Sequence, residues 1–288
     1  MGLQLESVKG RGYRIPQNFE LLNRQQIKAG FESKVSRQLK ALHIYQSLDS
    51  TNKMAIELIQ QQTESEPASG TVILSEYQTM GRGRRGKHWV SPFAANLYLS
   101  IIWDFDQGAS ALQGLSLGIG IAVSRALKQL GVNDVRLKWP NDIYINNKKL
   151  GGILLEMVGD PAGQCTVIIG IGINHCMPSQ SGQAIDQDWT DIDSEAQGTI
   201  SRNTLAGNII NCCFDLLSDY QQKGFEHYQQ EWQAIDAFKG RQATVSTANK
   251  STKGILMGVD KYGALKMKLD NGEIVSFIGG ELSLRAID

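Results

Sequence analysis

The chain has 288 residues, of which 41% are hydrophobic, which is enough apolar side chain to bury the cores of two domains. Its 29 basic and 29 acidic residues cancel, so no overall field favours nucleic acid or an anionic membrane, and any anion must bind at a local cluster. The chain starts without the apolar segment of a signal peptide, lacks an apolar run that could span a bilayer, and holds four cysteines without disulfide spacing, which predicts a cytoplasmic protein with reduced thiols.

The first residues predict a small β-hairpin. Leu3 and Leu5 alternate with polar residues, and the alternation returns at Tyr13 after a glycine-containing turn at residues 9–12. Two strands alone are marginally stable in water, so we expect this piece to be the edge of a larger unit or an addition to the main body. We assign residues 1–30 to this unit and its linker.

From about residue 38 the sequence shows a mixture of helical and strand patterns. Capping side chains at residues 49–51 predict a helix that follows them. Further helices are predicted over 112–130, 204–220 and 225–235, and strands over 72–74, 96–105, 135–139, 143–145, 150–158 and 165–173. Several consecutive strands without helices between them predict an α+β fold, with a mixed or antiparallel sheet and helices on one face.

The sequence pattern changes after Phe238. Five short β-rich runs follow, separated by turns at residues 249–250, 260–263 and 270–272. This spacing predicts a small β-barrel or sandwich. We therefore expect a catalytic domain over residues 31–237 and a separate C-terminal β-barrel domain over residues 238–288.

A glycine- and arginine-rich loop, Gly81–Trp89 (GRGRRGKHW), is the strongest local motif. Its glycines let the backbone take positive φ or approach a ligand closely, arginine forks bind carboxylates and phosphates in two-point fashion, and Trp89 can stack on a base. A basic surface loop or a nucleic-acid patch is the alternative interpretation. Because the whole chain is neutral and no second basic run flanks the loop, we favour a clamp over an anionic small molecule.

Two further segments carry polar groups at predicted strand ends. In Lys138–Asp142 (KWPND) the proline bends the chain and would leave a lysine, an amide and a carboxylate together; lysine can neutralise a phosphate and Asp142 can hold Mg²⁺. Lys149 follows seven residues later, ahead of two glycines. Taken alone, an Asn-Asp pair after proline is more commonly an ordinary turn.

Gly170–Asn174 (GIGIN) and Ser50–Asn52 (STN) are weaker signals. In isolation, the first is more simply a strand with packing glycines and the second a helix cap. The chain lacks the sequence signatures of a serine or cysteine nucleophile, and the adjacent His175 and Cys176 have no second pair with which to build a tetrahedral metal site.

Taken together and in order, these segments resemble the biotin protein ligases, especially the bacterial bifunctional ligase/repressor type. The resemblance runs from about residue 4 to the end of the chain. Its landmarks are Asp49–Asn52, Glu76–Gln78, Gly81–Gly86, Ser91–Phe93, Asn96–Tyr98, Lys138–Asp142, Lys149–Gly152, Gly170–Asn174 and Gly279–Glu281.

The resemblance implies a class II synthetase-like fold and roles for particular residues. The implied biotin-binding residues are Ser50, Thr51, Asn52, Gln78, Arg82, Gly83, Arg84, Lys149 and Gly152. The implied ATP-binding residues are Arg84, Trp89, Lys138, Asn141, Asp142 and Asn174, with Asp142 as the magnesium ligand, directly or through water. Arg84 and Lys149 would be the catalytic residues.

The implied reaction forms biotinyl-5′-AMP from biotin and ATP and then transfers biotin to one lysine of a biotin carboxyl carrier protein. Joining a carboxylate to the α-phosphate brings two anions together, so cations must neutralise both, and Arg84, Lys149 and Mg²⁺ are suited to this. A basic loop that closes over the reactive anhydride would exclude water until the acceptor lysine arrives.

The resemblance departs at the front of the chain. Repressor-type members carry a winged-helix domain, whereas this chain begins where the wing would be, so we expect ligase activity without binding to operator DNA. Lys9, Arg11 and Arg14 of the wing could keep a weak affinity for phosphate.

A homodimer through the central sheet is a further implication of the resemblance. The competing functions are a lipoate ligase or acyltransferase of the same fold and a biotin-responsive transcriptional regulator with little catalysis.

Overall fold

The computed structural model of the protein describes residues 6–8, 12–14, 20–61, 68–106, 108, 112–160, 163–246, 251–278 and 283–286. Among the helices in these ranges, none combines the length and the hydrophobicity that crossing a membrane requires. The predicted landmark Gly279–Glu281 and the hairpin positions 3, 5, 9–11 and 15 lie outside the described residues.

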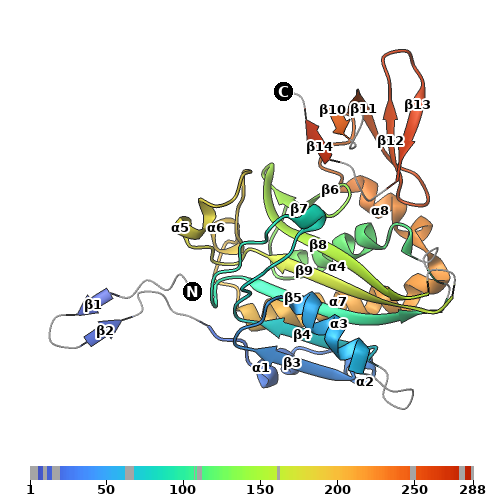
Figure 1. Ribbon diagram of the computed structural model, residues 1–288. Coiled ribbons are helices and arrows are strands. Elements are labelled where there is room, and N and C mark those ends of the chain that lie inside the picture. Colours follow the sequence, from blue (N-terminus) through green and yellow to red (C-terminus); the bar gives the residue numbers. More distant parts are fainter. Residues whose placement is uncertain are drawn as a thin grey trace.

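A seven-stranded mixed sheet forms the centre of the molecule (Figure 1). Its first pair, β3 and β4, is parallel, and every other neighbouring pair is antiparallel. In spatial order the strands are β3 (Ala41–Tyr45), β4 (Thr71–Ser75), β5 (Leu97–Phe105), β9 (Cys165–Ile173), β8 (Lys148–Gly159), β7 (Asp142–Ile145) and β6 (Arg136–Lys138). The mixed sheet and the six strands predicted for it are confirmed.

Most helices pack on one face of this sheet and enclose the main core. The long helices are α4 (Leu115–Gln129) and α7 (Arg202–Lys223), which lie against each other. Smaller elements are α1 (Arg24–Ala29), α2 (Ser33–Gln38), η3 (Phe225–Tyr228), α8 (Gln229–Ala234), α5 (Ser179–Gly182) and α6 (Ile192–Glu195). The predicted stop of α4 is confirmed, because the helix gives way to Gly131 at φ +80°.

Helix α3 (Thr51–Gln61) lies on the opposite face of the sheet, apart from the other helices (Figure 1). It is the crossover between the parallel strands β3 and β4, and its Ala55 and Ile59 pack on Ile73, Ile102 and Ile168 as a second, smaller core. The expectation that the helices lie on one face therefore does not hold for α3. This matters for the site, because the start of α3 is held over the middle of the sheet.

The C-terminal strands form a separate antiparallel sheet, as expected. Its order is β13 (Ile274–Phe277), β12 (Leu265–Lys268), β11 (Ser251–Val259), β10 (Gln242–Ser246) and β14 (Ser283–Ala286). No pairing joins β13 to β14 within the described strands, so closure into a barrel stays a prediction. The unit is tied to the main body where Trp139 Nε1 donates to the Gly263 carbonyl at 3.0 Å.

The predicted N-terminal hairpin is present as β1 (Glu6–Val8) paired antiparallel with β2 (Gly12–Arg14). The boundary expected at residue 31 differs from the structure, however. Ile27 of α1 is fully buried in the main core, and the Asn23 N–H donates to the Asn203 side chain at 2.7 Å. Residues 20–30 therefore pack as part of the main body.

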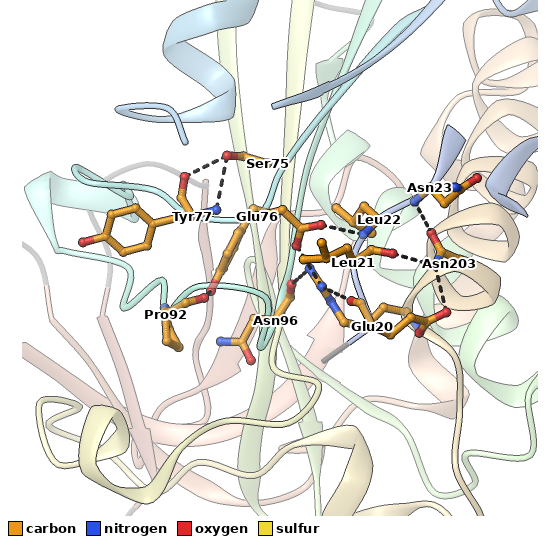
Figure 2. A network of polar contacts seen from close by, with 12 residues as sticks. Glu20, Leu21, Leu22, Asn23, Ser75, Glu76, Tyr77, Pro92, Asn96 and Asn203 are labelled. Carbon is orange, nitrogen blue, oxygen red and sulfur yellow. Dashed lines mark hydrogen bonds and ion pairs between the residues drawn. The ribbon is translucent and has the colours of Figure 1, made fainter. Parts of the chain in front are cut away.

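A buried arginine joins this N-terminal segment to the central sheet. Arg202, 2% exposed, donates to a Glu76 carboxylate oxygen at 2.9 Å, to the Glu20 carbonyl at 2.7 Å and to the Asn96 carbonyl at 2.8 Å. Figure 2 shows Glu20, Glu76 and Asn96 gathered in this network. Burial alone would raise the pKa of Glu20, but hydrogen bonds from Ser201, Asn203 and Arg202 outweigh it and lower that pKa.

Replacing Arg202 by methionine is expected to lower the free energy of unfolding by roughly 3 kcal/mol, because it leaves buried carboxylates without their counter-charge. Urea denaturation of both proteins measures the difference. Arg37→Met on α2 is the matched control, since Arg37 is exposed and should change stability by no more than about 0.5 kcal/mol. Equal midpoints for the two variants would contradict the structural role of Arg202.

Candidate active site

The start of α3 and the turn after β4 form one side of the candidate site. The Thr51 N–H donates to Gln78 Oε1 at 2.8 Å, and Gln78 Nε2 donates to Ser91 Oγ at 3.1 Å. All three side chains are buried. Ser50, also buried, lies at the beginning of the same helix, where its carbonyl accepts from the Met54 N–H. The structure thus brings the predicted residues Ser50, Thr51 and Gln78 together.

Asn52 continues this polar surface across the sheet. Its Nδ2 donates to Glu156 Oε2 on β8 at 2.7 Å, and its Oδ1 lies 2.6 Å from Ser100 Oγ on β5. Glu156 also pairs with Arg82 of the glycine-rich loop at 3.2 Å. Three elements that are distant in the sequence therefore meet at one carboxylate.

The Gly81–Trp89 loop is folded back on itself over this surface. The Gly83 N–H donates to the Lys87 carbonyl at 2.7 Å, the Trp89 N–H donates to the Gly81 carbonyl at 2.9 Å, and η1 (Arg84–Gly86) forms the tip. Of the three glycines only Gly86 has the positive φ expected of them (+70°), while Arg85 takes φ 58° beside it. Gly81 instead lets the backbone approach the Trp89 carbonyl closely, since a Cβ there would lie 2.5 Å from that oxygen.

The loop reaches the KWPND segment through Arg84. Its Nη1 donates to Asn141 Oδ1 at 3.1 Å, and Asn141 Nδ2 donates to the Ile153 carbonyl at 2.8 Å. Burial, reinforced by the charge of Arg85, lowers the pKa of the Arg84 guanidinium, and Asp142 opposes this shift. An anion bound beside Arg84 would compensate the desolvated charge.

Lys149 and Asp142 form the charged centre of the site. Lys149 Nζ lies 2.7 Å from Asp142 Oδ1, and both side chains are about 15% exposed (15% and 16%). They face each other because β7 and β8 form an antiparallel pair in which Asp142 pairs with Gly152 and, after a register shift, Tyr144 pairs with Lys149. The predicted bend at Pro140 is also present, since β6 ends at Lys138 and β7 begins at Asp142.

The indole of Trp89 covers the glycines of β8 and β9. A Cβ on Gly172 would lie 2.7 Å from Trp89 Cε2, whereas one on Gly152 would lie 3.5 Å from Trp89 Cζ3. Lys149 Nζ is 5.5 Å from the Trp89 ring centroid, within cation–π range. Close approach of this side chain thus explains Gly172 of the GIGIN strand, whereas Gly170 is approached by the Asn52 side chain.

Two buried polar atoms of the site have no hydrogen-bond partner among the described residues: Trp89 Nε1 and Asn174 Oδ1. Asn174 Nδ2 does donate to the Thr190 carbonyl at 3.0 Å. Buried donors and acceptors are nearly always paired with protein, water or ligand, so these two atoms point to a bound polar molecule. Lys138 Nζ donates to Tyr144 OH at 3.2 Å.

A magnesium ion would find one carboxylate here. Among the described residues no cluster of three histidine, cysteine, aspartate or glutamate side chains could hold a metal by itself. Mg²⁺ that arrives on ATP phosphates needs only one or two protein carboxylates, with waters and phosphate oxygens completing its shell. Asp142, beside Lys149, fits that role.

Sequence reasoning missed Glu156, Ser91 and Ser100. Glu156 did carry a signal, because it is the one charged residue inside the apolar run 150–158. Ser91 was named only within the landmark Ser91–Phe93 and was given no role. Ser100 carried no signal, since a serine in a strand is common and its partner here comes from another element.

Comparison with known proteins gives the same family at every level. Residues 44–174 match the biotin/lipoate A/B protein ligase family, and residues 239–285 match the biotin protein ligase C-terminal domain. The bifunctional ligase/repressor BirA of Escherichia coli strain K12 is 38% identical over 287 residues, covering 100% of this chain and 85% of that protein. The biotin–[acetyl-CoA-carboxylase] ligase of Paracoccus denitrificans is 31% identical, covering 76% of this chain and 91% of that protein.

The fold is also that of solved biotin protein ligases. The enzyme from Aquifex aeolicus, in complex with biotin and ATP, superposes with a TM-score of 0.72 at 25% identity and covers 86% of this chain and 100% of that one. A ligase from Leishmania major with biotinyl-5-AMP matches with a TM-score of 0.55 at 23% identity, a likeness of fold.

Proposed function

Because this chain belongs to the biotin protein ligase family, it is an ATP-dependent biotin ligase, and we propose that it forms biotinyl-5′-AMP and passes biotin to a lysine of a biotin carboxyl carrier protein. One observation carries the assignment of the site. The glycine-rich loop contacts the two other predicted parts of the centre, through Arg84 to Asn141 and through Trp89 to Lys149.

The biotin half of the proposed site is the surface around α3. Gln78, Thr51 and Asn52 present hydrogen-bonding groups that a cyclic urea can satisfy, while Ser50 lies at the same helix start. Arg82, Gly83 and Arg84 belong to the loop above it and would face the biotin carboxylate. Gly152 leaves room next to Lys149 for that carboxylate to approach.

The nucleotide half is proposed to run from Trp89 to Asn174. The unpartnered Trp89 Nε1 and Asn174 Oδ1 supply a donor and an acceptor for it, and Asn141 and Lys138 lie on the bend beside them. Mg²⁺, when bound, would neutralise charge on the ATP phosphates, with Asp142 as its protein ligand.

The reaction joins the biotin carboxylate oxygen to the α-phosphorus and expels pyrophosphate. Lys149 and Arg84 place two cations where the two anions must meet, and a partly buried site strengthens their effect. The closed loop then keeps water from the mixed anhydride. The acceptor lysine attacks the acyl carbon as a neutral amine, and AMP leaves.

We propose that the reaction takes place on the central sheet and that the C-terminal unit lies beside it. The four cysteines are all free thiols, which supports a reducing, cytoplasmic location. A dimer through the central sheet is left as a prediction of the resemblance.

The deciding experiment is isotope exchange between ATP and pyrophosphate, run with biotin and with lipoate separately. Biotin is expected to support exchange and lipoate to leave it at background. Subsequent addition of a purified carrier domain should yield one biotin per domain. Exchange with lipoate alone would overturn the proposal, as would tight, sequence-specific DNA binding without any exchange.

A further inference from the structure

A second polar cavity, of about 310 Å³, lies where the edge of the central sheet meets the start of the C-terminal unit. It is lined by Arg136, Tyr144, Asn147, Asp236, Ala237 and Arg241. None of these residues belongs to the biotin or nucleotide halves described above. Two of them are arginines that approach from different parts of the chain.

The backbone explains why the cavity exists. The Leu137 N–H donates to the Ile235 carbonyl at 2.8 Å, and the Ala237 N–H donates to the Leu137 carbonyl at 2.9 Å, so the segment after α8 runs alongside edge strand β6. The chain then turns, with the Phe238 N–H bonded to Asp236 Oδ1, and brings Arg241 back over the Phe238 ring at 5.5 Å. One wall thus comes from β6 and β7 and the other from residues 236–241.

The positive charge of the cavity is not neutralised by ion pairs. Arg136 donates to the Ala234 carbonyl at 3.2 Å and Arg241 to Asn147 Oδ1 at 3.3 Å, and within the described part of the chain neither forms a salt bridge. Two guanidinium groups on facing walls are a strong two-point recognition element for phosphate groups.

Neutral polar groups complete the lining. Burial raises the pKa of the Tyr144 hydroxyl, with Asp142 and Asp188 adding to the shift, so this group stays protonated at neutral pH. Asn147 adds an amide. Asp236 is the exception: it is an acid at the floor of the cavity, and its Oδ2 is buried without a partner among the described residues.

The cavity lies along the same sheet face as the reaction centre. Arg136 pairs with Tyr144 and Lys138 with Asp142 in the β6–β7 ladder, and alternate residues of a strand face the same side. Tyr144 and Asp142 are therefore about 7 Å apart along the strand. Lys138 lies between the two, since it pairs with Asp142 in the ladder and its Nζ is 3.2 Å from Tyr144 OH.

We propose that this cavity is a diphosphate-binding site that holds the pyrophosphate released by adenylate formation before it leaves the enzyme. The proposal rests on the proposed function, because pyrophosphate is a product only if the chain activates biotin with ATP. Arg136 and Arg241 donate hydrogen bonds to the phosphate oxygens from opposite walls. Lys138 provides a positive charge between the reaction centre and the cavity. The same chemistry would recognise the terminal phosphates of a nucleotide.

The site predicts an unusual pH dependence. Desolvation raises the pKa of Asp236 to about 6, against lowering by the Phe238 and Lys239 N–H groups and by the Lys239 charge. Above pH 6 the carboxylate is ionised and repels the anion, and below pH 6 it is neutral. The charged or titratable groups around it are Arg136, Lys138 and Tyr144 from the sheet, and Lys239 and Arg241 from the connecting segment. Affinity should therefore rise as pH falls through 6.

Calorimetric titration of pyrophosphate into the full-length protein, without biotin, ATP or magnesium, tests the site. The Arg136→Gln/Arg241→Gln variant is expected to bind pyrophosphate about tenfold more weakly or worse, because two charge-assisted contacts are lost. Arg24→Gln/Arg37→Gln, an equal loss of two charges at exposed positions of α1 and α2, is the matched control and should bind as the wild type does. Biotin-dependent adenylate formation in the double variant should stay within about twofold of wild type, while inhibition by added pyrophosphate weakens in parallel.

Asp236→Asn provides the second arm, which stays informative even if the double arginine variant fails to fold. Comparison with wild type at each pH cancels the ionisation of pyrophosphate itself. Wild type is expected to gain affinity for pyrophosphate between pH 7 and pH 5.5 as Asp236 is neutralised. Asp236→Asn is expected to lack this gain. An ADP titration identifies the source of the diphosphate: ADP binding that weakens equally in the arginine variant means a nucleotide tail also uses the cavity.

Unchanged pyrophosphate affinity in the double variant, or no pyrophosphate binding to the wild type, would overturn the site. Pyrophosphate binding that depends on the two arginines in a protein without biotin-dependent exchange would instead overturn the proposed function and leave the anion site standing. The two failures are therefore distinguishable.

Discussion

Lys149→Ala is expected to lower the rate of biotinyl-adenylate formation by about a thousandfold, comparable to removing a preorganised group that stabilises transition-state charge. The ammonium lies 2.7 Å from Asp142 and is only 15% exposed. Its loss removes one cation and also leaves the Asp142 carboxylate facing two incoming anions. Biotin-dependent exchange of pyrophosphate into ATP and single-turnover adenylate formation measure the effect.

The neighbouring lysine is the matched control. Lys148 is exposed on the same strand, and Lys148→Ala removes the same charge and side chain without touching Asp142, so its rate should stay within about threefold of wild type. A wild-type rate in Lys149→Ala would remove this lysine from the reaction centre.

Arg84→Gly is expected to speed the escape of biotinyl-adenylate by about 10- to 100-fold, the range for losing a charge-assisted contact of roughly 1.5 to 3 kcal/mol. Arg84 ties the loop tip to Asn141 at 3.1 Å, so without it the loop loses its hold on the opposite wall. The escaped anhydride would acylate lysines of bystander proteins. Labelling of serum albumin and the half-life of the adenylate on the enzyme after gel filtration report this.

Arg85 offers a control within the same loop. It is exposed and has φ 58°, a conformation that glycine adopts without strain, so Arg85→Gly removes an arginine while relaxing the backbone. Adenylate retention should remain as in wild type. If Arg84→Gly and Arg85→Gly release adenylate equally, net loop charge matters and the Arg84–Asn141 contact does not.

The closed loop has a consequence for the order of events. Arg82 contacts Glu156, Arg84 contacts Asn141, and Trp89 packs on the glycine strand. The loop is therefore held on the opposite wall at three points, and the same groups can form contacts around the bound adenylate. The desolvated guanidinium of Arg84 gains most from an anion, which favours closure on the adenylate over closure on itself.

Local patterns in the sequence were enough to predict the strands, the main helices and one half of the reaction centre. Lys149 and Asp142 are seven residues apart at the ends of two adjacent predicted strands, but the register shift between Ile143 and Tyr144 that sets the two side chains face to face was not part of that prediction. The stripe of α4, its stop before Gly131 and the bend at Pro140 are local. Such features depend on hydrophobic periodicity and backbone preference, which a sequence displays directly.

Contacts between distant segments were decided only by the tertiary structure. Asn52 and Glu156 are 104 residues apart, and Arg202 and Glu76 are 126 apart, yet each pair meets in the interior. Thr51 and Asn52 resemble ordinary cap residues in sequence, and they line a site because the crossover between β3 and β4 places α3 on the face opposite the other helices. The anion cavity needs one arginine from β6 and one from the segment that leads into the C-terminal unit, and its acid acquires a raised pKa only from burial. The sequence by itself determined the family and the strand pattern and singled out Lys149 and Asp142 as candidates, because these depend on neighbours along the chain. The tertiary structure decided that the two side chains pair and what shape the site has, because desolvation and partner choice depend on neighbours in space.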